Sequence, residues 1–291
     1  MKEEGAISGF RVRLFGDEPA ARYRVFELAF TGAFLVYMGR NLLTPLEWLT
    51  AEGFHLAAGL QRPGAMPPFP LLPVWAVPIF VGILLAAAAV IVLRPRHRRF
   101  GFAALALAAL YAEGVDSASS FALNRIYVVG FVFLALAPES DAGPRRGTVA
   151  SVRAFQAMLM AMYFATGLTK IKSGNWLEHS DVLWTHAQSY YATEMAAYLL
   201  RNLPARAWTA LQYSVLLFEL GAPLWFAWRR TRPYAILFGL SFHLGIALMM
   251  KAVWVFSLQM AAFYTLFLRE GAAAELLRRL RSALASIGRV K

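Results

Sequence analysis

The amino-acid sequence predicts an all-α integral membrane protein, a bundle of about eight transmembrane helices followed by an interfacial amphipathic helix at the C-terminus. Two observations predict this fold. Hydrophobic residues make up 59% of the chain and charged residues only 16%, which is far more apolar than an average soluble domain. The apolar residues are also concentrated in long runs, and the basic residues lie between those runs.

Eight apolar runs define the predicted spans. They cover Val25–Leu43, Val74–Leu93, Phe100–Gly114, Ile126–Ala137, Val149–Gly167, Trp208–Trp228, Tyr234–Met250 and Ala252–Leu268. The third and fourth runs are short for the ~20 residues that a perpendicular span needs. Because the loops are too small for an independent fold, we expect a single membrane domain over residues 1–291, with its spans at about 22–268.

The basic residues predict the orientation of the bundle. With eight spans and a cytoplasmic N-terminus, 21 of the 29 Lys and Arg residues fall on the cytoplasmic side and 8 on the other. This pattern follows the positive-inside rule and explains the net charge of +12 without a nucleic-acid partner. We expect a multi-pass protein of the inner (cytoplasmic) membrane, in contact with lipid, with both termini in the cytoplasm. The Ala-, Arg- and Leu-rich composition indicates a bacterial source.

The predicted C-terminal tail, residues 271–291, is basic and amphipathic. Leu277, Leu280, Leu284 and Ile287 share one face of a helix. A helix of this kind lies in the membrane interface. We expect it on the inner leaflet, with docking of a cytoplasmic partner as the alternative.

Cysteine and metal chemistry are not expected. The chain has no cysteine, which excludes disulfides, thiol nucleophiles and cysteine-ligated metals. Glu178, His179, Asp181 and His186 are of metal-ligand types but lack the spacing of a helical zinc site.

Three ionisable residues in or beside the apolar runs are candidates for function. Lys170 follows the run that ends at Gly167, and it is either an anchor that snorkels to the headgroups, with Trp176 in the aromatic belt, or a reactive base. Glu219 and His243 lie about halfway along their spans. Ionisable groups in a span must face the bundle interior and find partners, so each is either a structural hydrogen-bonding group or part of a site.

Four short blocks, in the same order along the chain, resemble one family. They read YF-x-x-G-x-x-K followed by Trp at Tyr163–Trp176, FE-L-x-x-PL at Phe218–Leu224, FH-x-x-x-A at Phe242–Ala247 and FS-L-x-M at Phe256–Met260. These blocks resemble the HTTM (horizontally transferred transmembrane) family, the membrane core shared with vitamin K-dependent gamma-carboxylase. The resemblance extends from about Arg22 to Leu268.

The resemblance implies a lyase or oxidoreductase that uses a reduced, vitamin K-like quinone, with oxygen and carbon dioxide. In the resembled enzyme a lysine deprotonates the reduced quinone, oxygen adds, and the strong base that results removes a carbon-bound proton. A peptide or protein substrate would reach the site from the extracytoplasmic side. The implied catalytic residues are Lys170 and His243, and the implied cofactor-binding residues are Trp176, Glu219, Asn124 and Arg125.

The chain departs from the carboxylase at two places. Arg125 stands where the carboxylase has a histidine, and residues 139–143 offer no counterpart of its DANHYWS segment. A non-catalytic membrane factor for the maturation or export of a secreted peptide is therefore a second hypothesis. A transporter with a site at Glu219 and His243 is a third, although no internal repeat supports it.

Overall fold

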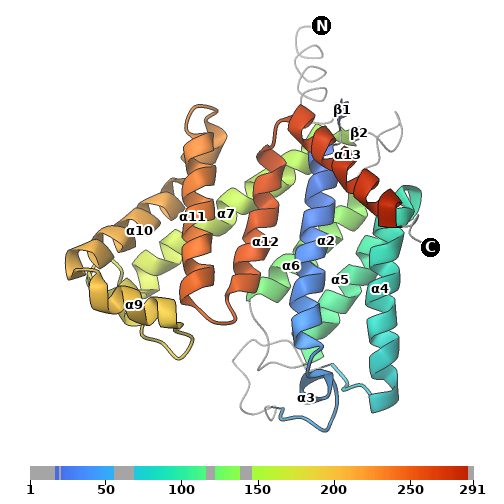
Figure 1. Cartoon of the computed structure of the whole chain (residues 1–291), viewed down its shortest axis with the longest axis horizontal. Coiled ribbons are helices and arrows are strands. Elements are labelled where there is room, and N and C mark those ends of the chain that lie inside the picture. The colour runs from blue at the N-terminus through green and yellow to red at the C-terminus, as the bar shows by residue number, and fades with distance from the viewer. Residues whose placement is uncertain (1–16, 20, 56–68, 116–121, 138–145, 288–291) are drawn as a thin grey trace, which may run out of the picture. The chain divides into compact units, whose positions relative to one another are not determined.

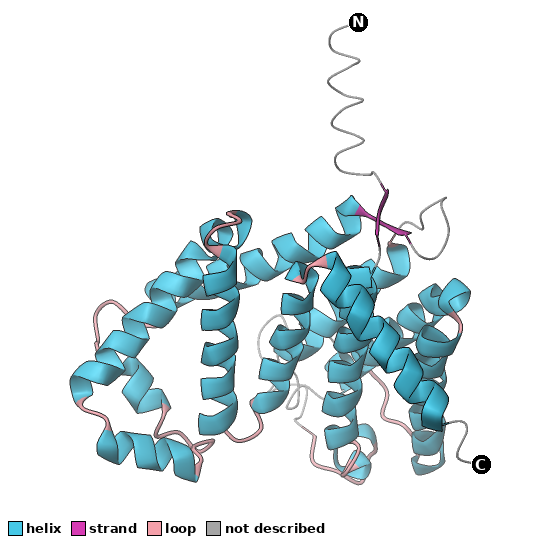
Figure 2. Cartoon of the chain, turned by 45° about the horizontal axis from the view of Figure 1, so that its top comes forward, coloured by secondary structure: helices cyan, strands magenta, loops and turns pink. Residues whose placement is uncertain are grey.

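The computed structural model of the protein describes residues 17–19, 21–55, 69–115, 122–137 and 146–287 (Figure 1). In these residues the chain is helical apart from one antiparallel pair of three-residue strands, β1 (Asp17–Pro19) and β2 (Arg146–Thr148), drawn in magenta in Figure 2. The predicted all-α class is confirmed. The chain forms two compact units, one of residues up to Ser151 and from Leu268 onward, the other of Val152–Phe267. The single domain over 1–291 stays a prediction.

The first unit is a set of packed helices with an aromatic core. Its elements are α2 (Ala21–Asn41), α3 (Pro45–Leu49), η2 (Val74–Ala76), α4 (Val77–Leu93), η3 (Pro95–His97), α5 (Arg98–Val115), α6 (Ala122–Leu136) and α13 (Glu270–Ile287). The rings of Phe30 and Tyr127 lie 5.0 Å apart, as do those of Phe34 and Phe131, so α2 and α6 meet through aromatic side chains. Gly130 permits this approach, because a Cβ there would lie 2.6 Å from the Phe30 ring.

A buried carboxylate in the first unit is matched by two guanidinium groups. Glu27 is only 2% exposed, and its Oε2 accepts from Arg24 Nη1 at 2.9 Å while its Oε1 lies 3.1 Å from Arg98 Nε. Both oxygens of the carboxylate are therefore paired, as a buried charge requires.

The C-terminal helix α13 packs on α2. The Glu270 carboxylate accepts from the backbone N–H of Ala21 at 2.6 Å, which caps the start of α2. Leu277 and Ala273 are buried against Val25. The helix predicted from the sequence exists, but part of the apolar face that was expected to lie in the membrane is covered by the protein itself, while Leu280 is exposed. The side chains of Leu284 and Ile287 lie outside the described part.

The second unit holds the long helices with the candidate residues. Its elements are α7 (Val149–Ser173, from Val152 on), α8 (Val182–His186), α9 (Glu194–Asn202), α10 (Ala205–Ala227), α11 (Arg232–Met249), α12 (Trp254–Tyr264) and η4 (Thr265–Phe267). Pro204 and Pro233 start α10 and α11, where a missing N–H costs nothing. The chain before α9 is tied to the end of α11, because Lys251 N donates to Tyr191 O at 2.6 Å and Thr193 N to Met249 O at 3.1 Å.

Each apolar run predicted from the sequence coincides with a helix. Among the described residues, four helices are long and apolar enough to cross a membrane, and they cover Val74–Leu93, Val149–Ser173, Ala205–Ala227 and Arg232–Met249. The apolar helices at Leu123–Leu136 and Trp254–Phe267 are shorter. Helices α2 and α5 carry the charges of Arg24, Glu27 and Arg98. A multi-pass membrane protein is confirmed, and the count of about eight spans stays a prediction.

Candidate functional site

The end of α7 folds back over Lys170. Helix α7 continues to Ser173, six residues beyond the Gly167 end expected from the sequence, so Lys170 lies in its last turn. The N–H groups of Gly174 and Trp176 both donate to Lys170 O, at 3.1 and 3.4 Å. Asn175 adopts φ 56°, a left-handed conformation that asparagine tolerates better than most residues. This turn places the Trp176 ring 4.5 Å from Lys170 Nζ, within the range of a cation–π contact.

Lys170 is directed at Glu219 on α10. Its Nζ lies 2.5 Å from Glu219 Oε1, and the two side chains are 19% and 3% exposed. A snorkelling lysine would extend toward the headgroups, whereas this one is held inside the unit by a carboxylate. The second carboxylate oxygen, Oε2, is buried and has no hydrogen-bond partner among the described residues.

Gln212 holds the loop that carries Trp176. Its side chain is fully buried, and Nε2 donates to Trp176 O at 2.9 Å and to His179 O at 2.6 Å. Its Oε1 accepts from Leu183 N at 3.0 Å. This residue was not among those predicted from the sequence. Its signal was the seven-residue spacing to Glu219, two helical turns that put both side chains on one face of an apolar helix.

His243 lies in a second polar cluster with two tyrosines. It is 2% exposed, and its Nε2 lies 2.7 Å from Tyr163 Oη, which in turn lies 2.5 Å from Tyr264 Oη. The burial and hydrogen-bonding partner predicted for His243 are therefore present. His243 Nδ1 is buried without a partner in the described part of the chain. Gly239 leaves room for Tyr264, because a Cβ at this position would clash with the tyrosine hydroxyl.

The roles of Tyr163 and Tyr264 were not predicted from the sequence. Tyr163 opens the first motif, seven residues before Lys170 on the same face of α7. The cluster adjoins the Lys170–Glu219 pair through Phe218, which precedes Glu219 on α10 and whose ring lies 5.1 Å from that of Tyr163. The structure therefore brings Lys170, Trp176, Glu219 and His243 together in one unit.

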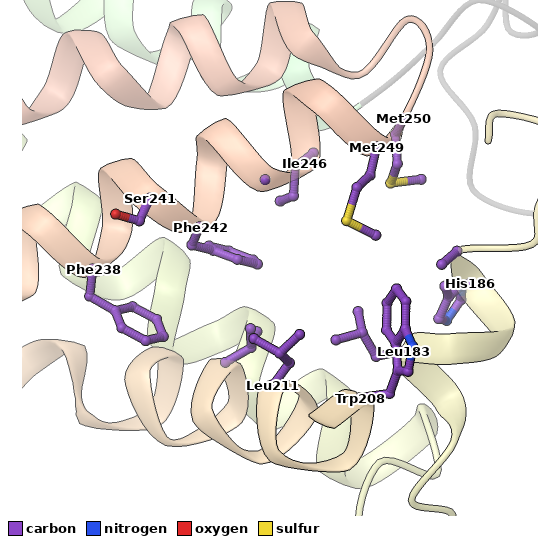
Figure 3. A pocket seen from close by; sticks show the side chains of 13 residues that line it. Leu183, His186, Trp208, Leu211, Phe238, Ser241, Phe242, Ile246, Met249 and Met250 are labelled. Carbon is purple, nitrogen blue, oxygen red and sulfur yellow. The ribbon is translucent and has the colours of Figure 1, made fainter. Parts of the chain in front are cut away.

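An apolar cavity adjoins this site. Its volume is about 280 Å³, and it lies between α8, α10 and α11 (Figure 3). Figure 3 shows the side chains of Phe242, Leu211 and Trp208 directed into the space between these helices. Val215 lines the cavity and belongs to the same buried cluster as Trp176, against which Phe242 also packs. One layer of side chains thus separates the cavity from Trp176.

Asn124 and Arg125 belong to the other unit. Asn124 is buried, and its Oδ1 accepts from Tyr37 Oη at 2.6 Å. Arg125 is 73% exposed and donates to Glu113 Oε1 at 2.8 Å. Their participation in the site of the second unit stays a prediction. Among the described residues, no group of three or more His, Asp or Glu side chains is arranged to hold a metal ion.

Comparison with known proteins identifies a family for the second half of the chain. The family model described as the HTTM domain matches residues 147–271, which include Lys170, Trp176, Glu219 and His243. No curated protein and no solved structure matches the chain. The family predicted from the four ordered motifs is confirmed. Residues 147–271 match the model of the HTTM domain, and the apolar helices support a multi-pass membrane protein.

Proposed function

We propose that this protein is an integral-membrane enzyme that resembles gamma-carboxylase and uses Lys170 as a base on a reduced quinone. The observation that carries the proposal is the surroundings of Lys170. This lysine contacts Glu219 and Trp176 at the end of a membrane helix, in a unit that also holds a buried histidine and an apolar cavity. An anchor needs none of these neighbours, whereas a base acting on a lipid-soluble molecule needs a closed, largely apolar site.

The residues present fit a neutral aromatic ring that carries oxygen atoms and an apolar chain. The cavity of about 280 Å³ is lined almost entirely by apolar side chains. Two buried polar atoms of the same unit that do not line the cavity, His243 Nδ1 and Glu219 Oε2, have no partner among the described residues. Buried polar atoms usually have partners; a ring hydroxyl would donate to Glu219 Oε2, and a second ring oxygen would pair with His243 Nδ1.

With such a ring bound, each residue of the site would have a specific role. Lys170 removes a proton from a ring hydroxyl, and Trp176 offers an aromatic face for stacking. His243 forms a hydrogen bond through Nδ1, and Tyr163 fixes the orientation of the imidazole by its bond to Nε2. A reduced quinone, when bound, would supply the acidic hydroxyl and the electrons for a reaction with oxygen, and carbon dioxide would be the further reactant of a carboxylation.

A non-catalytic membrane factor for the maturation or export of a secreted peptide is the second candidate function. The loop region between α7 and α10 favours it, because large aromatic side chains are exposed there. Tyr190 is 94% exposed, and Trp184, Tyr191 and Tyr198 are exposed as well. Aromatic side chains of this kind are enriched where proteins bind peptides. The same surface would serve a peptide substrate of the enzyme.

The orientation in the membrane is part of the proposal and has a direct test. The chain has no cysteine, so single cysteines report position without background. Tyr190→Cys, in the loop expected outside, should react with a membrane-impermeant maleimide in intact cells. Ser282→Cys, exposed on α13, should react only after the membrane is opened. Labelling in the reverse order would invert the topology and place Lys170 on the cytoplasmic side.

The cavity predicts where a quinone chain binds. A Cβ at Gly245 would meet no atom within 4 Å, so Gly245→Leu should fill the cavity without strain. In this variant we expect labelling by a photoreactive quinone in proteoliposomes to fall at least about tenfold. A tenfold loss of affinity corresponds to a loss of about 1.4 kcal/mol of binding free energy. Leu244→Phe, on the exposed side of the same helix, is the matched control and should label normally. Equal labelling of both variants would exclude the cavity as the binding site.

A further inference from the structure

The contacts of Lys170 are those of an ammonium group, while the proposed base must be a neutral amine. The 2.5 Å contact with Glu219 and the 4.5 Å distance to the Trp176 ring both suit a cation. Arginine and lysine differ here, because only lysine can give up its proton under physiological conditions. If Lys170 loses its proton, the nearest group that can accept the proton is its hydrogen-bond partner Glu219.

Both members of the pair are poorly solvated as ions. Among the described residues, Lys170 Nζ has one hydrogen-bond acceptor for its three N–H donors, and Glu219 Oε2 is buried with no donor at all. Taking two charges out of water is unfavourable unless the remaining hydrogen bonds are made. The free-energy cost of burying an unpaired polar atom is much smaller for a neutral group than for an ion.

Glu27 of the first unit shows the opposite arrangement at the same burial. Glu27 and Glu219 are both 2% exposed. Each oxygen of Glu27 is paired with a guanidinium group, from Arg24 and from Arg98. Guanidinium groups do not deprotonate in proteins, so neither partner of Glu27 can pass it a proton. Glu219 differs in having one unpaired oxygen and a partner that can lose its proton.

We propose that Lys170 passes a proton to Glu219 inside the buried pair, so that the pair rests as a neutral amine and a neutral carboxylic acid. An N–H bond of Nζ breaks, an O–H bond forms on Oε1, and the electron pair stays on the nitrogen. The hydroxyl of Glu219 then donates to the amine across the same 2.5 Å contact. The other titratable groups that face the pair are Tyr163 on α7 and His243 on α11, and neither takes part in the transfer.

This inference deepens the proposed function. Only the use of the neutral lysine as a base rests on that function. A lysine that rests as a neutral amine is ready to accept a proton from a ring hydroxyl. Glu219 then acts on Lys170 through Oε1, while its Oε2 remains open to the ring hydroxyl. The state of the pair itself is a property of the protein without any ligand.

Infrared difference spectroscopy on the purified protein in lipid tests the transfer directly. At neutral pH we expect the wild type to show the carbonyl stretch of a carboxylic acid, shifted in D₂O, that disappears in Glu219→Gln. Lys170→Arg should lose it too, because arginine keeps its proton and holds Glu219 as a carboxylate. Glu27→Gln is the matched control and should retain the band.

The outcomes separate this inference from the proposed function. Absence of the band in the wild type, or its persistence in either Glu219→Gln or Lys170→Arg, overturns the transfer. Should Glu219→Gln fail to fold, the comparison of wild type with Lys170→Arg decides, because that variant keeps a cation opposite the carboxylate. A band without quinone-dependent activity would leave the proton transfer standing and remove the proposed enzyme.

Discussion

Lys170→Arg is expected to be as inactive as Lys170→Ala, with a loss of about 10²- to 10⁴-fold in the rate of reduced-quinone consumption, the usual contribution of a general base. Arginine keeps the charge and can still contact Glu219 and Trp176, yet it cannot lose its proton. A snorkelling anchor would instead tolerate arginine, because either side chain reaches the headgroups. The measurement is quinone consumption by purified variants in proteoliposomes, at equal protein amounts.

Lys172→Arg supplies the matched control. Lys172 lies two residues further along α7 and is exposed, so exchange of its charged group should leave the rate unchanged. Full activity in Lys170→Arg would contradict the role of this residue as a base and favour the non-catalytic factor. Equal loss in both lysine variants would point to damage at the end of the helix rather than to a lost base.

Gly239→Ala should lower the stability of the protein by about 1–3 kcal/mol, the usual cost of overpacking a core. The added methyl group would clash with the Tyr264 hydroxyl and lie 3.2 Å from Phe218 Cζ. Tyr264 must then move, which also strains its 2.5 Å contact with Tyr163. Thermal unfolding in detergent, followed by circular dichroism, measures the change.

Gly245→Ala, on the same helix, should change stability in the opposite direction. A methyl group there meets no atom within 4 Å, and alanine in a helix is favoured over glycine by about 0.5–1 kcal/mol. Both variants gain the general preference of helices for alanine. The difference between their free energies of unfolding therefore reports only the close approach of α11 and α12. Similar unfolding temperatures for both would show that Gly239 is not needed for this contact.

The helices were predictable because their signal is local. The eight apolar runs all became helices, since run length and hydropathy depend on consecutive residues. The ends of the helices were harder to predict. The sequence analysis ended one span at Gly167, whereas α7 continues to Ser173 through Lys170 and Lys172, because a basic last turn is compatible with a helix end.

The candidate site was predictable only in part. The motifs pointed to Lys170, Trp176, Glu219 and His243, which the structure gathers in one unit. They did not include Gln212, whose three hydrogen bonds go to backbone groups 29 to 36 residues away and whose only signal in the sequence is its seven-residue spacing to Glu219. The amphipathic tail was also predicted, but its packing on α2 depends on residues about 250 positions away.

The sequence by itself determined the membrane class, the positions of the helices and the need for partners at Glu219 and His243, because an unpaired polar group in hydrocarbon costs several kcal/mol wherever it lies. Only the tertiary structure determined which residues those partners are. Lys170 and Glu219 are 49 residues apart in the chain, and Tyr163 and His243 are 80 apart. Such pairs meet only after α7, α10 and α11 have packed, and the packing depends on side-chain shapes along whole helices rather than on any local pattern.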